Sequence, residues 1–229
     1  MSKIDTVPVI ELHAELNPKI WTPDGDIQPE VQVALLRIAR EFYEFLAFPA
    51  PLKDVQITGS QANYTYSQYS DIDLHLIVPF DSVECDQPVE DLFDTKRKLW
   101  KERHNITIHG IPVEVYVEDR AKPAVSSNYS LLDNKWLTKP KKMQAHWDED
   151  AVSRETLIWL EHIKDAMATG DLDKLEQVKG HLSQYRQKGL DQDGELGAQN
   201  LAFKNLRNLG AISLLMQAIV KLKDQSLSI

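Results

Sequence analysis

The sequence predicts an α+β fold: a small mixed β-sheet flanked by helices over residues 1–122, followed by an all-helical C-terminal domain over residues 123–229. Before residue 122, short segments alternate apolar and polar side chains, which is the period of a half-buried strand. From about residue 149 onward, apolar side chains recur at the spacing of an amphipathic helix. With 229 residues, the chain has room for two such domains.

The N-terminal half is predicted to begin with a helix, because Pro29 suits a first helical turn and Pro49 and Pro51 end the helical pattern. No continuous period is visible in the first 28 residues. The apolar stripe of the helix is Val31, Leu35, Ile38, Phe42 and Phe45. The elements predicted after it are strands at 54–58 and 71–78, a charged helix at 89–103, and a hairpin of strands 106–108 and 113–117 that turns at His109-Gly110.

The C-terminal half is predicted to be loop-like over residues 123–147 and helical thereafter, with Gly170 and Gly210 separating helices. Tyr129 and Trp136 in the loop-like stretch have two interpretations. Aromatic rings of this kind stack on nucleic-acid bases, and they also pack as buried aromatics that bridge two halves of a protein. The apolar positions of the helices run over residues 157–167, 172–182, 201–209 and 212–222.

The bulk composition excludes several classes of protein. The formal net charge of −9 argues against a general duplex-DNA binder, whose affinity would come from Lys and Arg contacts to phosphates. No apolar run is long enough to span a bilayer, and the N-terminus lacks the apolar stretch of a secretory signal, so no membrane partner is expected. Cys85 is the only cysteine, which precludes an intrachain disulfide and favours a cytoplasmic location.

Two of the predicted strands combine an aliphatic face with an acidic face, because side chains alternate along a strand. The first strand has Ile72, Leu74, Leu76 and Val78 on one face and Asp71, Asp73 and His75 on the other. The second has Val113, Val115 and Val117 on one face and Glu114, Tyr116 and Glu118 on the other. Two carboxylates on one strand and a third on its neighbour can converge on two divalent cations about 4 Å apart, and such hard oxygen ligands suit Mg²⁺.

A glycine and a serine directly follow the predicted strand at 54–58. Glycine lets the backbone approach a phosphate closely, so Gly59 and the Ser60 hydroxyl are candidate ligands of a triphosphate. The order Gly59-Ser60, then ten residues, then Asp71-Ile72-Asp73, and later Glu114 resembles the signature of the DNA polymerase beta-like nucleotidyltransferase superfamily.

The resemblance implies a role for each residue of the motif. Asp71 and Asp73 would bind two Mg²⁺ ions, with Mn²⁺ as the alternative metal, and Glu114 would bind the catalytic ion and help to deprotonate the acceptor hydroxyl. Gly59 and Ser60 would hold the triphosphate. The resemblance covers residues 29–120, and the segment 195–207 is also similar to segments of nucleotidyltransferase-domain proteins, several of phage origin.

Lys204 and Arg207 are the predicted phosphate-binding cations, because the core strands supply none and residues three apart share a helix face. In this superfamily a helical second domain commonly closes over the nucleotide, which implies an active site in the cleft between the halves. Solvated surface positions are the alternative for both residues. For His75 and Glu118 a structural hydrogen bond is preferred over contact with a ligand, and Tyr116 is expected to pack beside the strand pair.

The predicted activity is transfer of a nucleoside monophosphate, by default AMP from ATP, to an acceptor hydroxyl with release of pyrophosphate. The acceptor stays open among an RNA 3′ end, a protein hydroxyl and a small molecule. Two other functions are alternatives. A catalytically inactive nucleotide-binding regulatory module is disfavoured by the intact carboxylates, and a metal-dependent phosphohydrolase by the Gly-Ser spacing.

Overall fold

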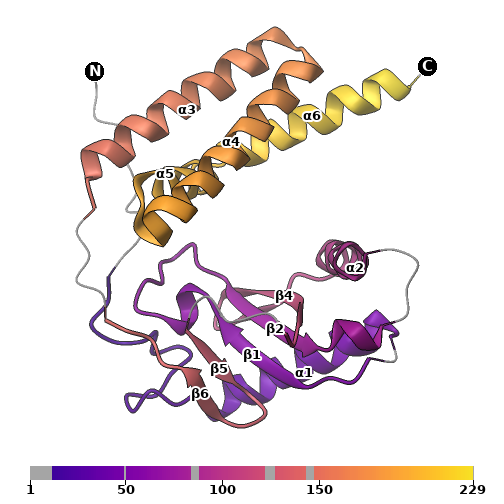
Figure 1. The fold of residues 1–229 in the computed structure, drawn as a ribbon, viewed down its shortest axis with the longest axis vertical. Coiled ribbons are helices and arrows are strands. Elements are labelled where there is room, and N and C mark those ends of the chain that lie inside the picture. The colour runs from indigo at the N-terminus through magenta and orange to yellow at the C-terminus, as the bar shows by residue number, and fades with distance from the viewer. Residues whose placement is uncertain (1–11, 49, 84–87, 122–126, 143–146, 229) are drawn as a thin grey trace. The chain divides into compact units, whose positions relative to one another are not determined.

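The computed structural model describes residues 12–48, 50–83, 88–121, 127–142 and 147–228. The chain forms two compact units, one holding the described residues from 12 to 142 and the other those from 147 to 228. The first unit is a mixed sheet with helices and the second is helical, so the predicted fold class is confirmed (Figure 1). The predicted domain boundary at residues 122 and 123 lies outside the described residues, as do Cys85 and Pro49.

Six strands form one sheet in the described part of the first unit, in the order β3-β4-β2-β1-β5-β6. The sheet is mixed because β2 and β4 run parallel and the other neighbours run antiparallel. The β2–β4 pair is the crossover, with helix α2 between its strands in sequence. The strands are β1 (Asp54–Thr58), β2 (Ile72–Val78), β3 (Thr107–Ile108), β4 (Ile111–Asp119), β5 (Asn128–Ser130) and β6 (Lys135–Thr138).

Strands β5 and β6 correct the prediction of a loop-like stretch at 123–147. They form a hairpin that adds to β1, with Tyr129 opposite Ile57 and opposite Trp136. Tyr129 is fully buried against Trp21 and Trp136, so it is a core residue of this unit and is not available to stack on a base. Segments of three and four residues are too short to show a strand period, and β1, with which β5 pairs, is distant in sequence.

Helix α1 (Pro29–Leu46) supplies one side of the main core. Pro29 occupies the first turn, where a missing N–H costs nothing, and Ala47 closes the helix in the left-handed conformation. The buried stripe is Val31, Leu35, Ala39, Phe42 and Leu46, so Ile38 and Phe45 of the predicted stripe lie at its margin and are partly buried. This stripe packs with the aliphatic faces of β1 and β2.

Helix α2 (Val89–Arg103) has the predicted bounds and lies beside β4 (Figure 1). The buried side chains of Phe93 and Trp100 pack α2 against the core. The Trp100 ring contacts that of Phe42 in α1 edge to face, with 5.4 Å between ring centroids. The hairpin of β3 and β4 turns at His109 and Gly110, as the sequence predicts. Both residues have positive φ.

The described residues of the second unit form four α-helices, and residues between α3 and α4 show how the sequence ends one helix and starts the next. Gly170 ends α3 in the left-handed conformation, and the Asp171 carboxylate caps the start of α4 by accepting from the backbone N–H groups of Asp173 and Lys174. The main core includes Trp159, Ile163, Leu182, Leu206 and Leu215. The helices are α3 (Glu149–Thr169), α4 (Leu172–Asp193), α5 (Ala198–Asn208) and α6 (Ala211–Leu227).

Among the described residues, the helices lack the combination of length and apolar character that crossing a lipid bilayer requires.

The packing of α1 gives a direct test of the core. Leu35→Ala should lower the free energy of unfolding by about 2–5 kcal/mol, because Leu35 is fully buried and its truncation leaves a cavity. Val33→Ala, on the same helix but 57% exposed, should change it by less than about 0.5 kcal/mol. Urea denaturation followed by tryptophan fluorescence measures both, and equal midpoints for the two variants would contradict this packing.

Candidate active site

Three carboxylates gather where β2 and β4 lie side by side. Asp71 immediately precedes β2, Asp73 lies within it, and Glu114 is paired with Asp73 across the parallel ladder. One carboxylate oxygen from each residue can be chosen so that all three lie within 4.8 Å of one another. All three side chains are partly buried, so they share a site that solvent reaches. The structure therefore brings together the three acids that the sequence singled out.

The aliphatic side chains between these acids fix the direction in which the acids point. Ile72 and Leu74 are fully buried and Val115 is 4% exposed. Because neighbouring residues of a strand point to opposite faces, burial of these three turns Asp71, Asp73 and Glu114 to the other face. The same hydrophobic burial that stabilises the sheet thus concentrates negative charge on its open side.

Gly59 lies directly against the Asp73 side chain, and its backbone conformation favours glycine. Thr58 is paired with Asp73 across β1 and β2, and Gly59 follows with φ 72° and ψ −158°, a region that is essentially restricted to glycine. A Cβ atom at Gly59 would overlap the Oδ2 atom of Asp73 and lie 3.1 Å from its Cγ atom. The glycine that was predicted for its closeness to phosphate is thus also required by the neighbouring acid.

Ser60 begins a short 3₁₀ helix, η1 (Ser60–Ala62), and its hydroxyl donates to the Oγ atom of Ser70 at 2.8 Å. Gln61 adds a second link between the same segments, since its Nε2 atom donates to the carbonyl of Ser70 at 3.2 Å. These bonds tie the segment after β1 to the residue that precedes Asp71. The two bonds therefore tie the start of the ten-residue connection to its end, next to Asp71.

Two residues that precede α1, Asn17 and Trp21, form hydrogen bonds with the loop after β1. No pattern in the sequence predicts these contacts. Gln61 is 1% exposed and accepts a hydrogen bond from the Asn17 side chain at 2.9 Å. The indole N–H of Trp21 donates to the carbonyl of Gln61 at 2.7 Å. Asn17 and Trp21 are buried, so both are positioning residues for the loop that carries Gly59 and Ser60.

Glu114 is bound through both carboxylate oxygens. The Tyr116 hydroxyl donates to Oε2 at 2.7 Å, and the Lys101 ammonium of α2 forms an ion pair with Oε1. Burial alone would raise the pKa of Glu114, but the hydrogen bonds from Lys101 and Tyr116 and the charges of Lys101 and Arg97 together lower it. Burial and the bond to Glu114 raise the pKa of Tyr116, so its hydroxyl keeps its proton and donates.

Helix α2 supplies cations that the sequence analysis did not place in the site. The Arg97 guanidinium lies 4.9 Å from the ring centroid of Tyr116, and its Nε and Nη2 atoms donate to Oδ1 of Asp94 at 3.1 and 2.6 Å. Lys101 follows one turn later and contacts Glu114. The sequence analysis missed these two cations, because no local pattern reveals that α2 lies beside β4.

His75 and Glu118 form a pair of their own further along β2 and β4. The Nδ1 atom of His75 lies 2.9 Å from Oε2 of Glu118, and the His75 ring is tilted against Tyr116 with 4.8 Å between centroids. The preferred interpretation of His75 and Glu118 as structural residues agrees with this hydrogen bond, and Tyr116 packs beside the strand pair as expected.

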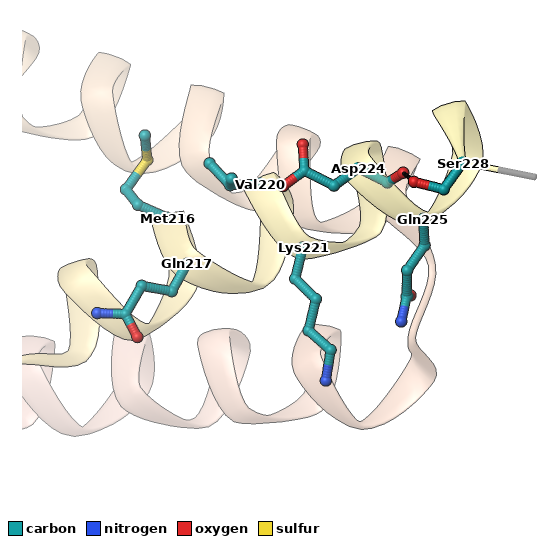
Figure 2. A pocket seen from close by; sticks show the side chains of 7 residues that line it. All are labelled: Met216, Gln217, Val220, Lys221, Asp224, Gln225 and Ser228. Carbon is teal, nitrogen blue, oxygen red and sulfur yellow. Dashed lines mark hydrogen bonds between the residues drawn. The ribbon is translucent and has the colours of Figure 1, made fainter.

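Lys204 and Arg207 belong to α5 of the second unit, where Lys204 is partly buried and Arg207 is exposed. Their role as phosphate ligands stays a prediction. A hollow of about 540 Å³ in the same unit runs along α6, where Met216 and Val220 form its apolar part and Lys221 and Asp224 carry charges (Figure 2). Neither Lys204 nor Arg207 lines it, so this hollow is separate from the predicted ligands.

The chemistry of the acidic residues fits a divalent cation. Three carboxylate oxygens within 4.8 Å of one another form a hard, negatively charged donor set, which is what Mg²⁺ and Mn²⁺ prefer. Ion pairing of Glu114 with Lys101 also indicates that this position attracts positive charge. Asp71, Asp73 and Glu114 are thus the residues that would hold a metal ion.

Comparison with known proteins finds a family model that matches part of the chain. Residues 39–134 match the family model described as a nucleotidyltransferase domain, and domains of this family act on nucleoside triphosphates. The matched residues include Gly59, Ser60 and all three acids. None of the curated proteins compared with the chain matches it.

Among solved structures, the chain is similar to the STING-associated CdnE c-di-GMP synthase from Capnocytophaga granulosa. The identity is 15%, the alignment covers 88% of this chain and 68% of that one, and the TM-score is 0.25.

The contact of Gly59 with Asp73 predicts a specific defect. Gly59→Ala should weaken Mn²⁺ binding about tenfold or more, because the new methyl group displaces a carboxylate of the acidic trio. Gly110→Ala is the matched control, since Gly110 also has positive φ but has no atoms within 4 Å of its would-be Cβ atom.

The control should lose about 1 kcal/mol of stability from backbone strain and keep its Mn²⁺ affinity. Calorimetric titration with Mn²⁺ and thermal unfolding separate the two effects. If Gly59→Ala bound Mn²⁺ as tightly as Gly110→Ala does, the contact would have no influence on the site.

Proposed function

We propose that the protein is a metal-dependent nucleotidyltransferase that transfers a nucleoside monophosphate from a nucleoside triphosphate to an acceptor hydroxyl. AMP from ATP is the default donor reaction. The observation that carries the proposal is the convergence of Asp71, Asp73 and Glu114 beside the Gly59-Ser60 loop, within the residues that match a nucleotidyltransferase domain. Two Mg²⁺ ions, or Mn²⁺ in their place, are the proposed cofactors.

In the proposed reaction the acceptor oxygen attacks the α-phosphorus of the nucleotide in line with the leaving group. A new phosphorus–oxygen bond forms to the acceptor, and the bond between the α-phosphorus and the oxygen that bridges to the β-phosphorus breaks. Pyrophosphate leaves with that electron pair, and the acceptor hydroxyl gives up its proton. Divalent cations held by the three carboxylates would supply charge neutralisation on the leaving group and acidify the acceptor hydroxyl.

The loop after β1 is proposed to hold the triphosphate. Gly59 exposes backbone where a side chain would block a phosphate, and the Ser60 hydroxyl can turn from Ser70 to a phosphate oxygen, since it both donates and accepts. Lys204 and Arg207 are retained as proposed phosphate ligands from the helical unit, on the basis of their charge and shared helix face.

Glu114 is proposed to act as a metal ligand first and as a base second. Its pKa is lowered, which keeps it ionised but makes it a weak proton acceptor. Tyr116 keeps Oε2 in a fixed orientation through a neutral hydroxyl. Polarisation of the acceptor hydroxyl by a bound cation would therefore contribute most to its deprotonation, and the proton would pass to Glu114 or to water.

The acceptor is an RNA 3′ end, a protein hydroxyl or a small molecule in this proposal, and these are separated by experiment. Incubation of the protein with each α-³²P-labelled nucleoside triphosphate, Mg²⁺ and separate RNA, protein and metabolite fractions should label one fraction. Asp71→Asn and Glu114→Gln should each reduce the transfer rate about 100-fold or more, because each removes a charged ligand from the site.

Glu118→Gln is the matched control for Glu114→Gln, because it makes the same change on the same strand face outside the acidic trio. It should retain most of the transfer activity. Release of pyrophosphate supports transfer, whereas release of orthophosphate would identify a phosphohydrolase. Nucleotide binding without transfer to any fraction would favour the inactive regulatory module.

A further inference from the structure

The ion pair of Lys101 with Glu114 joins a helix to the acidic trio. Lys101 lies on α2 and Glu114 on β4, so the contact is tertiary and not a pairing within one element. The side chain of Lys101 is 65% exposed, whereas that of Glu114 is 20% exposed. An exposed lysine contributes little stability through such a pair. Because Lys101 contacts a candidate metal ligand, however, its charge can affect the binding of ligands at that site.

The two oxygens of Glu114 have partners of different rigidity. Oε2 accepts from Tyr116, whose ring lies under the guanidinium of Arg97, and Arg97 is fixed in turn by two hydrogen bonds to Asp94. Oε1 is bound by an ammonium at the end of a flexible four-carbon stem. Glu114 can therefore exchange the partner of Oε1 while Tyr116 holds the rest of the carboxylate in place.

A divalent cation on Glu114 would compete with Lys101 for the same charge. Two positive groups in contact with one carboxylate repel each other strongly at such short distances, especially where solvent is partly excluded. The ammonium is the more mobile of the two, because most of its side chain is exposed. A cavity of about 30 Å³, room for one water molecule, is lined by both Lys101 and Glu114.

The displaced ammonium would remain tethered near the place where substrate phosphates bind. The three carboxylates lie within 4.8 Å of one another, so a side chain in contact with one of them reaches ligands of all three. A nucleotide bound there through divalent cations brings several phosphate oxygens, and a nearby ammonium would stabilise their negative charge. Lys101 thus has a charged partner both before and after substrate binds.

We propose that Lys101 is a nucleotide-binding residue of this site, which neutralises Glu114 until a metal ion binds and then transfers its ion pair to a phosphate oxygen of the nucleotide. The inference rests on the proposed function, because it requires metal and triphosphate at the same carboxylates. It predicts that loss of Lys101 has opposite effects on two affinities. Metal alone should bind more tightly, and nucleotide together with metal should bind more weakly.

The test uses the full-length protein and Lys101→Met, which keeps an unbranched side chain and removes the charge. Mn²⁺ binding is measured by electron paramagnetic resonance of the free ion, and calorimetry then measures binding of α,β-methylene-ATP at saturating Mn²⁺. The variant should bind Mn²⁺ about three- to fivefold more tightly and the analogue about three- to fivefold more weakly, which is the size of an exposed ion-pair effect.

Two controls isolate the contact. Lys96→Met makes the same charge change on α2, but the Lys96 ammonium lies 5.6 Å from the ring centroid of Phe45 on α1, so both affinities should change by less than about twofold. In a Glu114→Gln background, Lys101→Met should no longer tighten Mn²⁺ binding, because the two effects are coupled through one contact. Thermal unfolding verifies that every variant is folded.

Changes of the same sign in the two arms, or changes no larger than those of Lys96→Met, would overturn the role of Lys101 and leave the proposed transferase intact. If the wild-type protein bound no Mn²⁺ and Asp71→Asn altered nothing, the metal site itself would be wrong and this inference would fall with it.

Discussion

Pairing of β2 with β1 on one side and β4 on the other is the constraint on which the site depends. Asp73 lies opposite Thr58 in one ladder and opposite Glu114 in the other. A shift of either strand by one residue would turn its aliphatic face outward, and the cost of exposing Leu74 or Val115 prevents it. The register that buries the core is therefore the register that assembles the acids.

Gathering three carboxylates on a partly buried surface carries an electrostatic cost, which neighbouring groups offset. Lys101 and Arg97 bring positive charge from α2, and Tyr116 adds a hydrogen bond from a group that keeps its proton. Like charges crowded together raise each other's pKa values and destabilise the fold. At Glu114 the effect of burial, which raises the pKa, is smaller than the combined effect of these partners, so the pKa is lowered.

The acidic residues could be predicted from the sequence because their arrangement is local. Asp73 and Glu114 lie in strands and Asp71 directly precedes one, so apolar neighbours alternate with all three acids, and alternation needs no knowledge of distant contacts. Lys101, Asn17 and Trp21 could not be found in this way, because their roles depend on which elements pack together. Strands β5 and β6 were missed for the same reason, since β5 pairs with β1, which is distant in sequence, and β6 pairs with β5. The functional roles of all these residues remain predictions.

The close approach of Gly59 to Asp73 has a consequence for the energetics of ligand binding. The backbone of the loop and the carboxylate occupy adjoining space with no room between them, and Gln61, held by Asn17 and Trp21, limits how far the loop can retreat. If a nucleotide and a cation bind at these two positions, as proposed above, a shift of the loop toward Asp73 displaces the carboxylate. The two ligands are then coupled through this contact, and thermodynamic reciprocity requires each to change the affinity of the other by the same factor.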